Sequence, residues 1–581
     1  MIKTLMAQIG RYRRDSLLTP LFTALEVVME ILIPYVTASI IDKGIQAKDL
    51  SSVYRYGALM LALAFLSLLF GVLAGKHAAA ASSGFACNLR DAMYANIQTF
   101  SFSNIDKFST AGLVTRMTTD VTNLQNAYQM LLRVAVRAPL MLVCSMMMCF
   151  AIHARLSLTF LAAIAFLACV LVYMLRTAMP LFTQVFARYD DLNASVQENV
   201  SGIRVVKAFV REEHEDEKFT RAADTLSRLF TRAESIVVAN SPVMMIAVYG
   251  CILSLSWFGA HYIVGGTLTT GNLTSLFSYV MQMLMSLMML SFVFVMITMS
   301  SASARRICEV LTERPDLTDP AEPETVVADG SIDFDYVSFS YRSGSGEDTL
   351  HDIDLHIRSG ETVGVIGGTG CGKSSFVSLI SRLYDVTDGA VRVGGRDVRA
   401  YDTEALRSQV AVVLQKNVLF SGTILENLRW GNADATEAEC AEACRLACAD
   451  EFIEKLPDGY QTHIEQGGAN VSGGQKQRLC IARALLKKPK VLILDDSTSA
   501  VDTATDAKIR RAFAEHIPGT TKLIISQRIS SVQDADRVLV LDDGRVSAFD
   551  THENLLQTNA IYREIVQAQQ QSGGDFDRPN D

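Results

Sequence analysis

A glycine-rich run that begins at residue 367 carries the clearest chemistry in the sequence. It follows the apolar segment 362–366 and reads Gly367, Gly368, Thr369, Gly370, Cys371, Gly372, Lys373, Ser374 and Ser375. This is the spacing of a phosphate-binding loop between a strand and a helix, where backbone N–H groups surround phosphate oxygens. The lysine adds positive charge, the Ser374 hydroxyl can ligate Mg²⁺, and the helix start favours an anion. The run therefore predicts a site for a nucleoside triphosphate and its magnesium ion.

A second stretch offers a carboxylate to the same ion. Residues 491–494 are apolar and lead into Asp495 and Asp496. A buried strand that ends in a carboxylate beside a phosphate loop can hold Mg²⁺ directly or through water. We therefore expect Asp495 to be a magnesium ligand.

The elements that position these residues read as an α/β domain. Short apolar runs at residues 362–366, 410–414, 491–494, 523–525 and 538–541 alternate with helical stretches, which is typical of a parallel sheet with crossover helices. Cys440, Cys444 and Cys448 are spaced to share one helix face. A metal cluster is one reading of this spacing, and small apolar residues on a buried face are the better one.

The first half of the chain reads as membrane-spanning. Residues 56–75, 138–154 and 156–175 lack charged side chains, and residues 235–304 form a charge-free run with a Gly- and Thr-rich break at 261–272. Residues 17–40 are a weaker span because they contain Glu26 and Glu30. Each span is long enough to cross about 30 Å of hydrocarbon. The two glutamates are four residues apart, and either line a translocation path or are satisfied by a neighbouring helix.

These observations predict six membrane helices with both termini in the cytoplasm, because the count is even and the N-terminus is basic. Two long connections, 76–137 and 176–234, would extend the helices into the cytoplasm. The resulting domains are a transmembrane domain at 1–304, a proline-containing linker at 305–330, an α/β domain at 331–570 and a disordered tail at 571–581. The glutamates in the first span argue against a cleavable signal peptide.

Composition excludes several classes of protein. Hydrophobic residues make up 49% and charged residues 20%, which excludes a disordered, collagen-like or small disulfide-stabilised chain. Residues 1–330 contain 26 Lys and Arg against 25 Asp and Glu, whereas residues 331–581 contain 27 against 37. The acidic second half argues against nucleic acid as a partner.

A third motif makes the resemblance to a known family specific. Between the two nucleotide motifs stand Ser472, Gly473, Gly474 and Gln475. With them, residues 1 to about 570 resemble one half of an ATP-binding cassette (ABC) transporter of the exporter type. The resemblance implies an all-α domain of six membrane helices followed by an α/β ATPase domain, located in the plasma membrane. It also implies ATP and Mg²⁺ as ligands and hydrolysis coupled to transport.

Other positions match the family in turn. Tyr341 corresponds to the aromatic residue that stacks on adenine, and Gln415 to the glutamine that senses the γ-phosphate and joins Ser374 and Asp495 around Mg²⁺. Residues 499–502 resemble the loop that contacts the opposite subunit. Residues 117–124 and 201–206 are the expected coupling helices. In this family each ATP lies between the phosphate loop of one subunit and the Ser-Gly-Gly-Gln signature of the other, so a dimer is implied.

Two positions depart from the family pattern. The catalytic glutamate that ordinarily follows the magnesium aspartate is replaced by Asp496, and the switch histidine is replaced by Gln527. The resemblance then points to a degenerate site that binds ATP and hydrolyses it slowly, as in one subunit of bacterial heterodimeric multidrug exporters. A homodimer with two slow sites is the alternative.

The cargo is less defined by the sequence. Met281, Met283, Met285, Met288 and Met289 concentrate in the sixth span. Flexible methionines would suit hydrophobic or amphipathic cargo, although they also serve as ordinary packing residues. An importer of siderophore-like cargo and an ATP-sensing regulatory subunit are the other functions that the same fold would allow.

Overall fold

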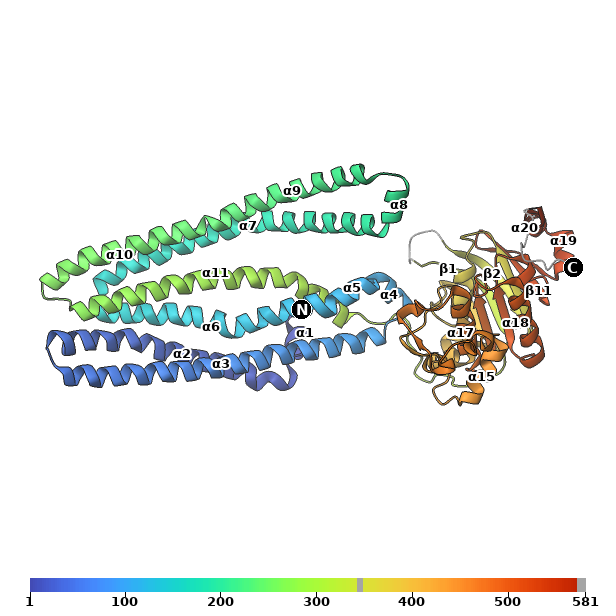
Figure 1. The fold of residues 1–581 in the computed structure, drawn as a ribbon, viewed down its shortest axis with the longest axis horizontal. Coiled ribbons are helices and arrows are strands. Elements are labelled where there is room, and N and C mark those ends of the chain that lie inside the picture. Colours follow the sequence, from blue (N-terminus) through green and yellow to red (C-terminus); the bar gives the residue numbers. More distant parts are fainter. Residues whose placement is uncertain (342–347, 572–581) are drawn as a thin grey trace. The chain divides into compact units, whose positions relative to one another are not determined.

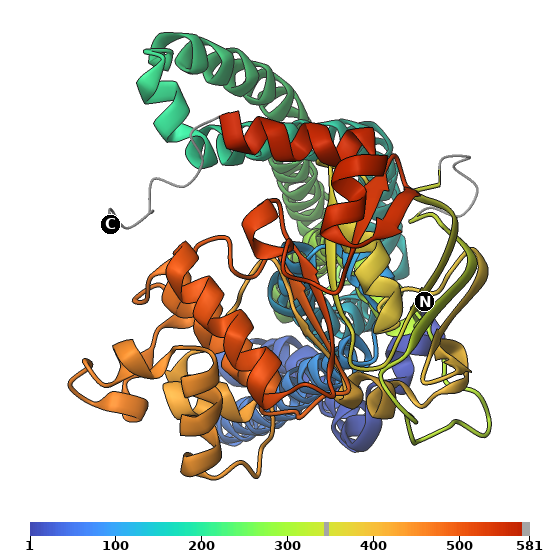
Figure 2. The ribbon, with the colours of Figure 1, turned by 90° about the vertical axis from the view of Figure 1, so that its right-hand side faces the viewer.

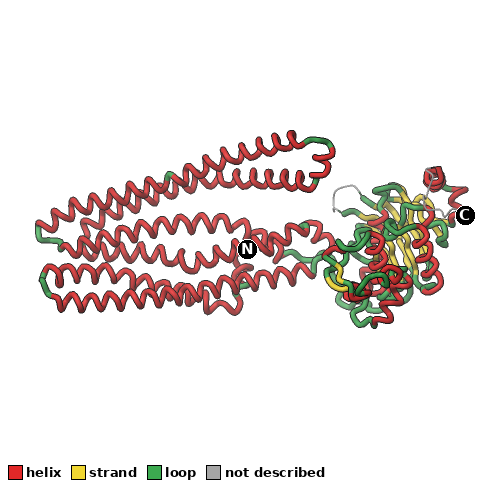
Figure 3. The backbone as a smooth tube through the Cα atoms, in the orientation of Figure 1, coloured by secondary structure: helices red, strands yellow, loops and turns green. Residues whose placement is uncertain are grey.

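The computed structural model describes residues 1–341 and 348–571, and the chain divides into two compact units (Figure 1). One unit comprises Met1–Gln98 and Thr110–Glu313, and the other comprises Thr99–Ser109 and the chain from Arg314 onward. The first unit is helical, whereas the second combines helices with strands (Figure 3).

The helical unit contains six stretches long and apolar enough to cross a membrane within the described residues. They are Gly10–Gln46, Leu50–Gln98, Thr110–Ile152, Ala154–Phe182, Glu212–Val264 and Thr270–Thr312. The helices that build them are α2 (Arg13–Ser39), α3 (Leu50–Gln98), α6 (Val121–Ile152), α7 (Ala154–Ser201), α9 (Glu212–Val238), α10 (Asn240–Val264) and α11 (Thr270–Thr312). Shorter segments are α1 (Ile2–Ala7), η1 (Gly10–Tyr12), η2 (Ile40–Gln46), α5 (Thr110–Thr115), η3 (Arg116–Asp120) and α8 (Ile203–Ala208).

The helices pack in two sets. In one set α2 lies against α3 and α6, and α6 lies against α11, while in the other α7 lies beside α9 and α10 (Figure 1). Buried side chains such as Val27, Met141 and Leu284 join α2, α6 and α11 in one apolar cluster. The predicted tight turn between the third and fourth spans falls at His153, whose ring accepts a hydrogen bond from the N–H of Leu156 at 3.3 Å and so caps α7.

The second unit contains a six-stranded sheet in the order β12-β11-β3-β10-β9-β6. Its strands are β3 (Thr362–Gly367), β6 (Val410–Val413), β9 (Val491–Asp495), β10 (Thr521–Ile525), β11 (Arg537–Asp542) and the antiparallel edge strand β12 (Arg545–Asp550). A four-stranded antiparallel sheet contains β1 (Ile332–Phe339), β2 (Leu350–Ile357), β4 (Asp388–Val393) and β5 (Arg396–Asp397). A small third sheet pairs β7 (Gly422–Thr423) with β8 (His463–Ile464). The predicted fold class, six membrane-type helices followed by an α/β domain, is confirmed.

Helices complete the second unit. They are α4 (Phe102–Phe108), α12 (Lys373–Ile380), α13 (Thr403–Gln409), α14 (Ile424–Arg429), α15 (Glu437–Leu446), α16 (Asp450–Ile453), α17 (Gly473–Leu485), α18 (Thr503–His516), α19 (His552–Thr558) and α20 (Ala560–Gln571). The last two lie side by side at the C-terminal end of the described chain, in red in Figure 2. The polar tail predicted for 571–581 lies outside the described residues after position 571.

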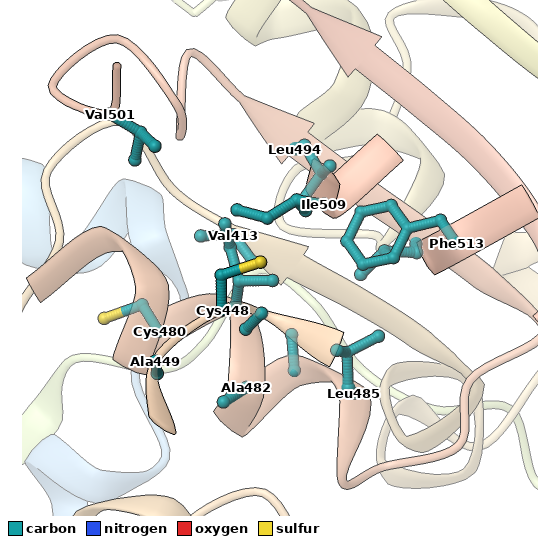
Figure 4. Close-up of a cluster of buried hydrophobic side chains, with 14 of the residues drawn as sticks. Val413, Cys448, Ala449, Cys480, Ala482, Leu485, Leu494, Val501, Ile509 and Phe513 are labelled. Atoms are coloured by element: carbon teal, nitrogen blue, oxygen red, sulfur yellow. The ribbon is translucent and has the colours of Figure 1, made fainter. Parts of the chain in front are cut away.

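A large apolar core joins α17 and α18 to strands β6 and β9. Figure 4 shows Val413, Leu494, Leu485 and Phe513 meeting in it. Cys440, Cys444 and Cys448 are buried in the same cluster, and burial raises the pKa of the Cys444 thiol to about 12. No group of three or more metal-binding side chains occurs among the described residues. Because they are buried among apolar side chains, these cysteines pack as small apolar residues.

Candidate nucleotide-binding site

The parallel strands of the large sheet bring the predicted nucleotide motifs to one edge. Strand β10 pairs in parallel with β3 and β9, and β9 pairs in parallel with β6. Their carboxyl ends therefore coincide, as at ligand sites of open α/β sheets. The phosphate loop follows β3, Asp495 ends β9, Gln415 stands two residues beyond β6, and Gln527 stands two residues beyond β10.

The phosphate loop ends at the start of α12. Gly372 precedes this helix with φ +92°, and a Cβ atom there would lie 2.7 Å from Cδ2 of Leu350, so only glycine fits without strain. The Lys373 ammonium group donates hydrogen bonds to the carbonyl oxygens of Gly367 at 2.9 Å and Gly368 at 2.7 Å. The Lys373 side chain therefore folds back onto the phosphate loop.

Asp495 and Ser374 form an oxygen-rich pair beside this loop. Burial raises the pKa of the Asp495 carboxyl, while a hydrogen bond with Ser374 and the charge of Lys373 oppose the rise. A carboxylate beside a hydroxyl is a donor set that suits Mg²⁺. Ser374 and Asp495 therefore fit the predicted magnesium ligands, and Gln415 lies at the same sheet edge.

The backbone ties Asp496 to the strand that leads to Gln527. The N–H of Asp496 donates to the carbonyl of Ile525 at 3.0 Å, which ties the end of β9 to the end of β10. Asp496 has φ +47°, a conformation that aspartate tolerates better than most residues. Burial raises the pKa of its carboxyl, and a hydrogen bond with Gln415 and the charges of Arg528 and Lys373 oppose the rise. Asp496 and Gln527 thus follow the carboxyl ends of the neighbouring strands β9 and β10, and their membership in one catalytic site stays a prediction.

Tyr341 stands at the rim of the phosphate loop with a half-exposed ring. Its hydroxyl lies 2.9 Å from the hydroxyl of Ser375, and its ring meets that of Tyr384 edge-on at 5.1 Å. The residue as a whole is 51% exposed. The adenine-stacking role that the resemblance implies for Tyr341 stays a prediction.

Tyr384 connects this aromatic pair to a short helix from the first half of the chain. Its hydroxyl donates to Asp106 of α4 at 2.8 Å, and its ring lies near that of Phe102 at 6.2 Å. Ser103 of α4 donates to Asp316 at 2.6 Å. Helix α4 is therefore part of the second unit, which contains the phosphate loop and is called the nucleotide unit below. It contacts Tyr384, the aromatic neighbour of Tyr341.

The position of α4 differs from the sequence-based expectation. Residues 117–124, expected as the first coupling helix, lie within η3 and the start of α6, whereas the turn between the long helices is α4. A capping box of Ser101 and Asn104 starts α4, and this Ser-x-x-Asn pattern is the signal that could have located it. The second expected coupling helix, 201–206, overlaps α8 (Ile203–Ala208).

Replacing Tyr384 by phenylalanine should weaken the coupling of ATP hydrolysis to transport. The change removes only the hydrogen bond to Asp106, worth about 1 kcal/mol, so we expect the transport-to-hydrolysis ratio to fall about 2- to 5-fold with nucleotide affinity nearly unchanged. The measurement is ATP-driven transport in proteoliposomes alongside phosphate release.

Tyr401→Phe is the matched control for this experiment. The Tyr401 hydroxyl donates to the carbonyl of Val393 in β4 at 2.8 Å, and among the described residues it makes no hydrogen bond with α4. A transport-to-hydrolysis ratio in Tyr384→Phe equal to that of the wild type would contradict a role for the Tyr384–Asp106 contact. An equal fall of this ratio in Tyr401→Phe would contradict it as well.

The signature residues start α17 and pack against the loop at 499–502. Ser472 caps α17 and forms a capping box with Gln475. A Cβ atom on Gly474 would lie 2.7 Å from the carbonyl oxygen of Ala500, so a side chain at 474 would push the loop away. Among the described residues no hydrogen bond joins residues 472–475 to the phosphate loop. The structure therefore brings together the predicted residues of the site except this signature.

The chain matches two family models and is similar to several known proteins. Residues 17–287 match the family described as ABC transporter transmembrane region, and residues 350–499 match the family described as ABC transporter. The chain is 37% identical over 547 residues to the uncharacterized ABC transporter ATP-binding protein YfiB of Bacillus subtilis, covering 94% of each chain. It is 32% identical over 456 residues to a fatty acid ABC transporter ATP-binding/permease protein of Mycobacterium bovis, covering 78% of this chain and 72% of the relative.

A solved structure shares the fold. The structure of a bacterial Atm1-family ABC exporter with ATP bound superposes with a TM-score of 0.82 at 24% sequence identity, covering 97% of this chain and 99% of that one.

Proposed function

Since the chain belongs to the ABC transporter family and fuses a transmembrane domain to an ATP-hydrolysing domain, we propose that it is the degenerate-site subunit of a heterodimeric exporter. In this proposal the transporter lies in the plasma membrane with both termini cytoplasmic. It moves hydrophobic or amphipathic compounds outward.

The observation that carries the proposal is that Asp496 and Gln527 follow two neighbouring strands, β9 and β10, at one edge of the sheet. An aspartate carboxylate is about 1.5 Å shorter in reach than glutamate, and an error of about 1 Å can cost about 100-fold in general-base catalysis. A glutamine amide can donate a hydrogen bond to a phosphate oxygen, but it carries no charge and no labile proton near neutral pH. The site is therefore suited to hold ATP longer than it cleaves it.

Other residues of the chain serve binding rather than cleavage. The phosphate loop and Lys373 hold the phosphates, and Tyr341 stacks on the adenine. Ser374, Gln415 and Asp495 would hold Mg²⁺, which would neutralise charge on the phosphates when bound. Ser472–Gln475 starts a helix apart from the phosphate loop and would complete the site of the partner subunit.

A cavity in the helical unit supports an amphipathic cargo. It has a volume of about 340 Å³ and lies between α2, α6 and α11. Glu30 and Arg137 contribute charge to its wall, and Met141, Met285 and Met289 contribute flexible apolar surface. A wall of this mixed kind accommodates molecules that have both a polar and an apolar part. The relative named as a fatty acid transporter is consistent with such cargo.

The decisive experiment compares the two ATP sites of the complex. The chain is co-purified with a half-transporter encoded beside it, and ATPase activity is measured with amphipathic compounds. Changing the partner's catalytic glutamate to glutamine should lower the rate more than about 100-fold, whereas Asp496→Asn should lower it less than about threefold.

Two results would contradict the proposal. One is an equally severe loss from Asp496→Asn. The other is fast ATP hydrolysis by this chain when it is purified alone as a homodimer.

A further inference from the structure

The last described helix, α20, presents one face to the segment that follows β10. Tyr562, Val566 and Gln569 are spaced four and three residues apart, so they share a helix face. Tyr562 is fully buried, and Val566 is 5% exposed. Both pack in the apolar cluster that includes Ile529, the first residue of η7 (Ile529–Ser531). The helix is thereby anchored beside the loop that contains Gln527.

Gln569 continues this face with two hydrogen bonds to the loop backbone. Its amide nitrogen donates to the carbonyl oxygen of Gln527 at 2.7 Å. Its amide oxygen accepts from the N–H of Ile529 at 2.9 Å. One side chain thus bridges the backbone on both sides of Arg528.

The opposite side of the same loop is fixed by Arg528. Its guanidinium group donates to the carbonyl oxygens of Ser499 at 3.0 Å and Val501 at 3.3 Å. Those carbonyls belong to the loop that packs against the signature helix. The segment 527–529 is therefore held between α20 and the 499–502 loop.

We propose that Gln569 is a positioning residue for the ATP site, which holds the 527–529 segment where Gln527 reaches the γ-phosphate. The inference rests on the proposed role of Gln527 as the residue at the γ-phosphate. Without the Gln569 bridge, the carbonyl of Gln527 and the N–H of Ile529 lose their shared partner, and the loop gains freedom. Only a nucleotide with a γ-phosphate depends on that loop position.

The test compares ATP with ADP in the full-length chain. Gln569→Met keeps the length and volume of the side chain but removes both hydrogen bonds. We expect the variant to bind Mg²⁺ with a non-hydrolysable ATP analogue about 3- to 10-fold more weakly, with ADP affinity unchanged. Gln569→Glu keeps the acceptor for Ile529 but places a carboxylate against the carbonyl of Gln527, so it should also lose affinity for the ATP analogue selectively.

Gln570→Met is the matched control, since Gln570 is the exposed neighbour on the same helix. It should bind both nucleotides like the wild type. An unchanged ratio of analogue to ADP affinity in Gln569→Met would overturn the proposal. An equal loss of both nucleotides would overturn it as well, because that pattern indicates general destabilisation. Failure of the proposed degenerate-site function would show itself separately, as fast ATP turnover by the wild-type chain alone.

Discussion

Changing Asp496 to glutamate and Gln527 to histidine together is expected to raise ATP hydrolysis at this site about 10- to 100-fold. The glutamate would extend a carboxylate toward the attacking water by one methylene group, and the histidine would supply a group that titrates near neutral pH. The hydrogen bond between the N–H of Asp496 and the carbonyl of Ile525, at 3.0 Å, ties position 496 to the end of the strand that precedes position 527.

The gain is measured in the complex whose other site is inactivated by a glutamate-to-glutamine change in the partner. Either substitution alone should give a smaller gain, because a carboxylate and a switch residue act on the same step. Adding Lys373→Ala should remove the gained activity, which shows that it arises at this phosphate loop. A double variant no faster than its parent would show that the two positions do not limit hydrolysis.

Changing Arg137 to alanine is expected to lower the free energy of unfolding of the helical unit strongly. The Arg137 guanidinium group pairs with Glu26 and with Glu30, the latter at 2.6 Å. Glu26 is 7% exposed. Arg137 bonds its Oε1, while its Oε2 has no hydrogen-bond partner among the described residues. Removing the cation leaves a buried charge uncompensated, which costs about 3–5 kcal/mol and should lower the Tm by about 5–10 °C.

The measurement is thermal unfolding of the full-length protein in nanodiscs, followed by circular dichroism. Arg133→Ala is the control: Arg133 lies one turn earlier on α6 and has no ion pair among the described residues, so its loss should change the Tm little. Adding Glu26→Gln and Glu30→Gln to the Arg137 variant should recover most of the loss. If the triple variant stays as unstable as the single one, lost packing rather than uncompensated charge explains the effect.

The sheet edge that forms the site could be predicted because its signals are local. Each parallel strand is a short apolar run, and the phosphate loop, Asp495, Gln415 and Gln527 lie at or within two residues of the end of one. The carboxyl ends of parallel strands meet by geometry alone, so Lys373, Asp495 and Gln527 could be placed together before any tertiary contact was known.

Contacts between residues far apart in the sequence could not be predicted in this way. The sequence left open whether Glu26 and Glu30 face a path or a partner, and the structure shows that they share Arg137 from another helix, with Glu30 also lining the cavity. Helix spacing indicates which residues share a face, but not which distant helix lies opposite that face. The same holds for Gln569, whose glutamine-rich surroundings give no sign that it reaches Gln527.

The turn formed by residues 99–109 has a practical consequence for domain exchange. It belongs to the nucleotide unit although both of its chain neighbours belong to the helical unit. If only the part from residue 314 onward is replaced by that of a relative, the turn at 99–109 still comes from this protein. The relative's residues at positions 316 and 384 would then contact a turn that did not come with them. Chimeras of this protein should therefore exchange residues 99–109 together with the C-terminal half, so that each hybrid inherits a matched pair.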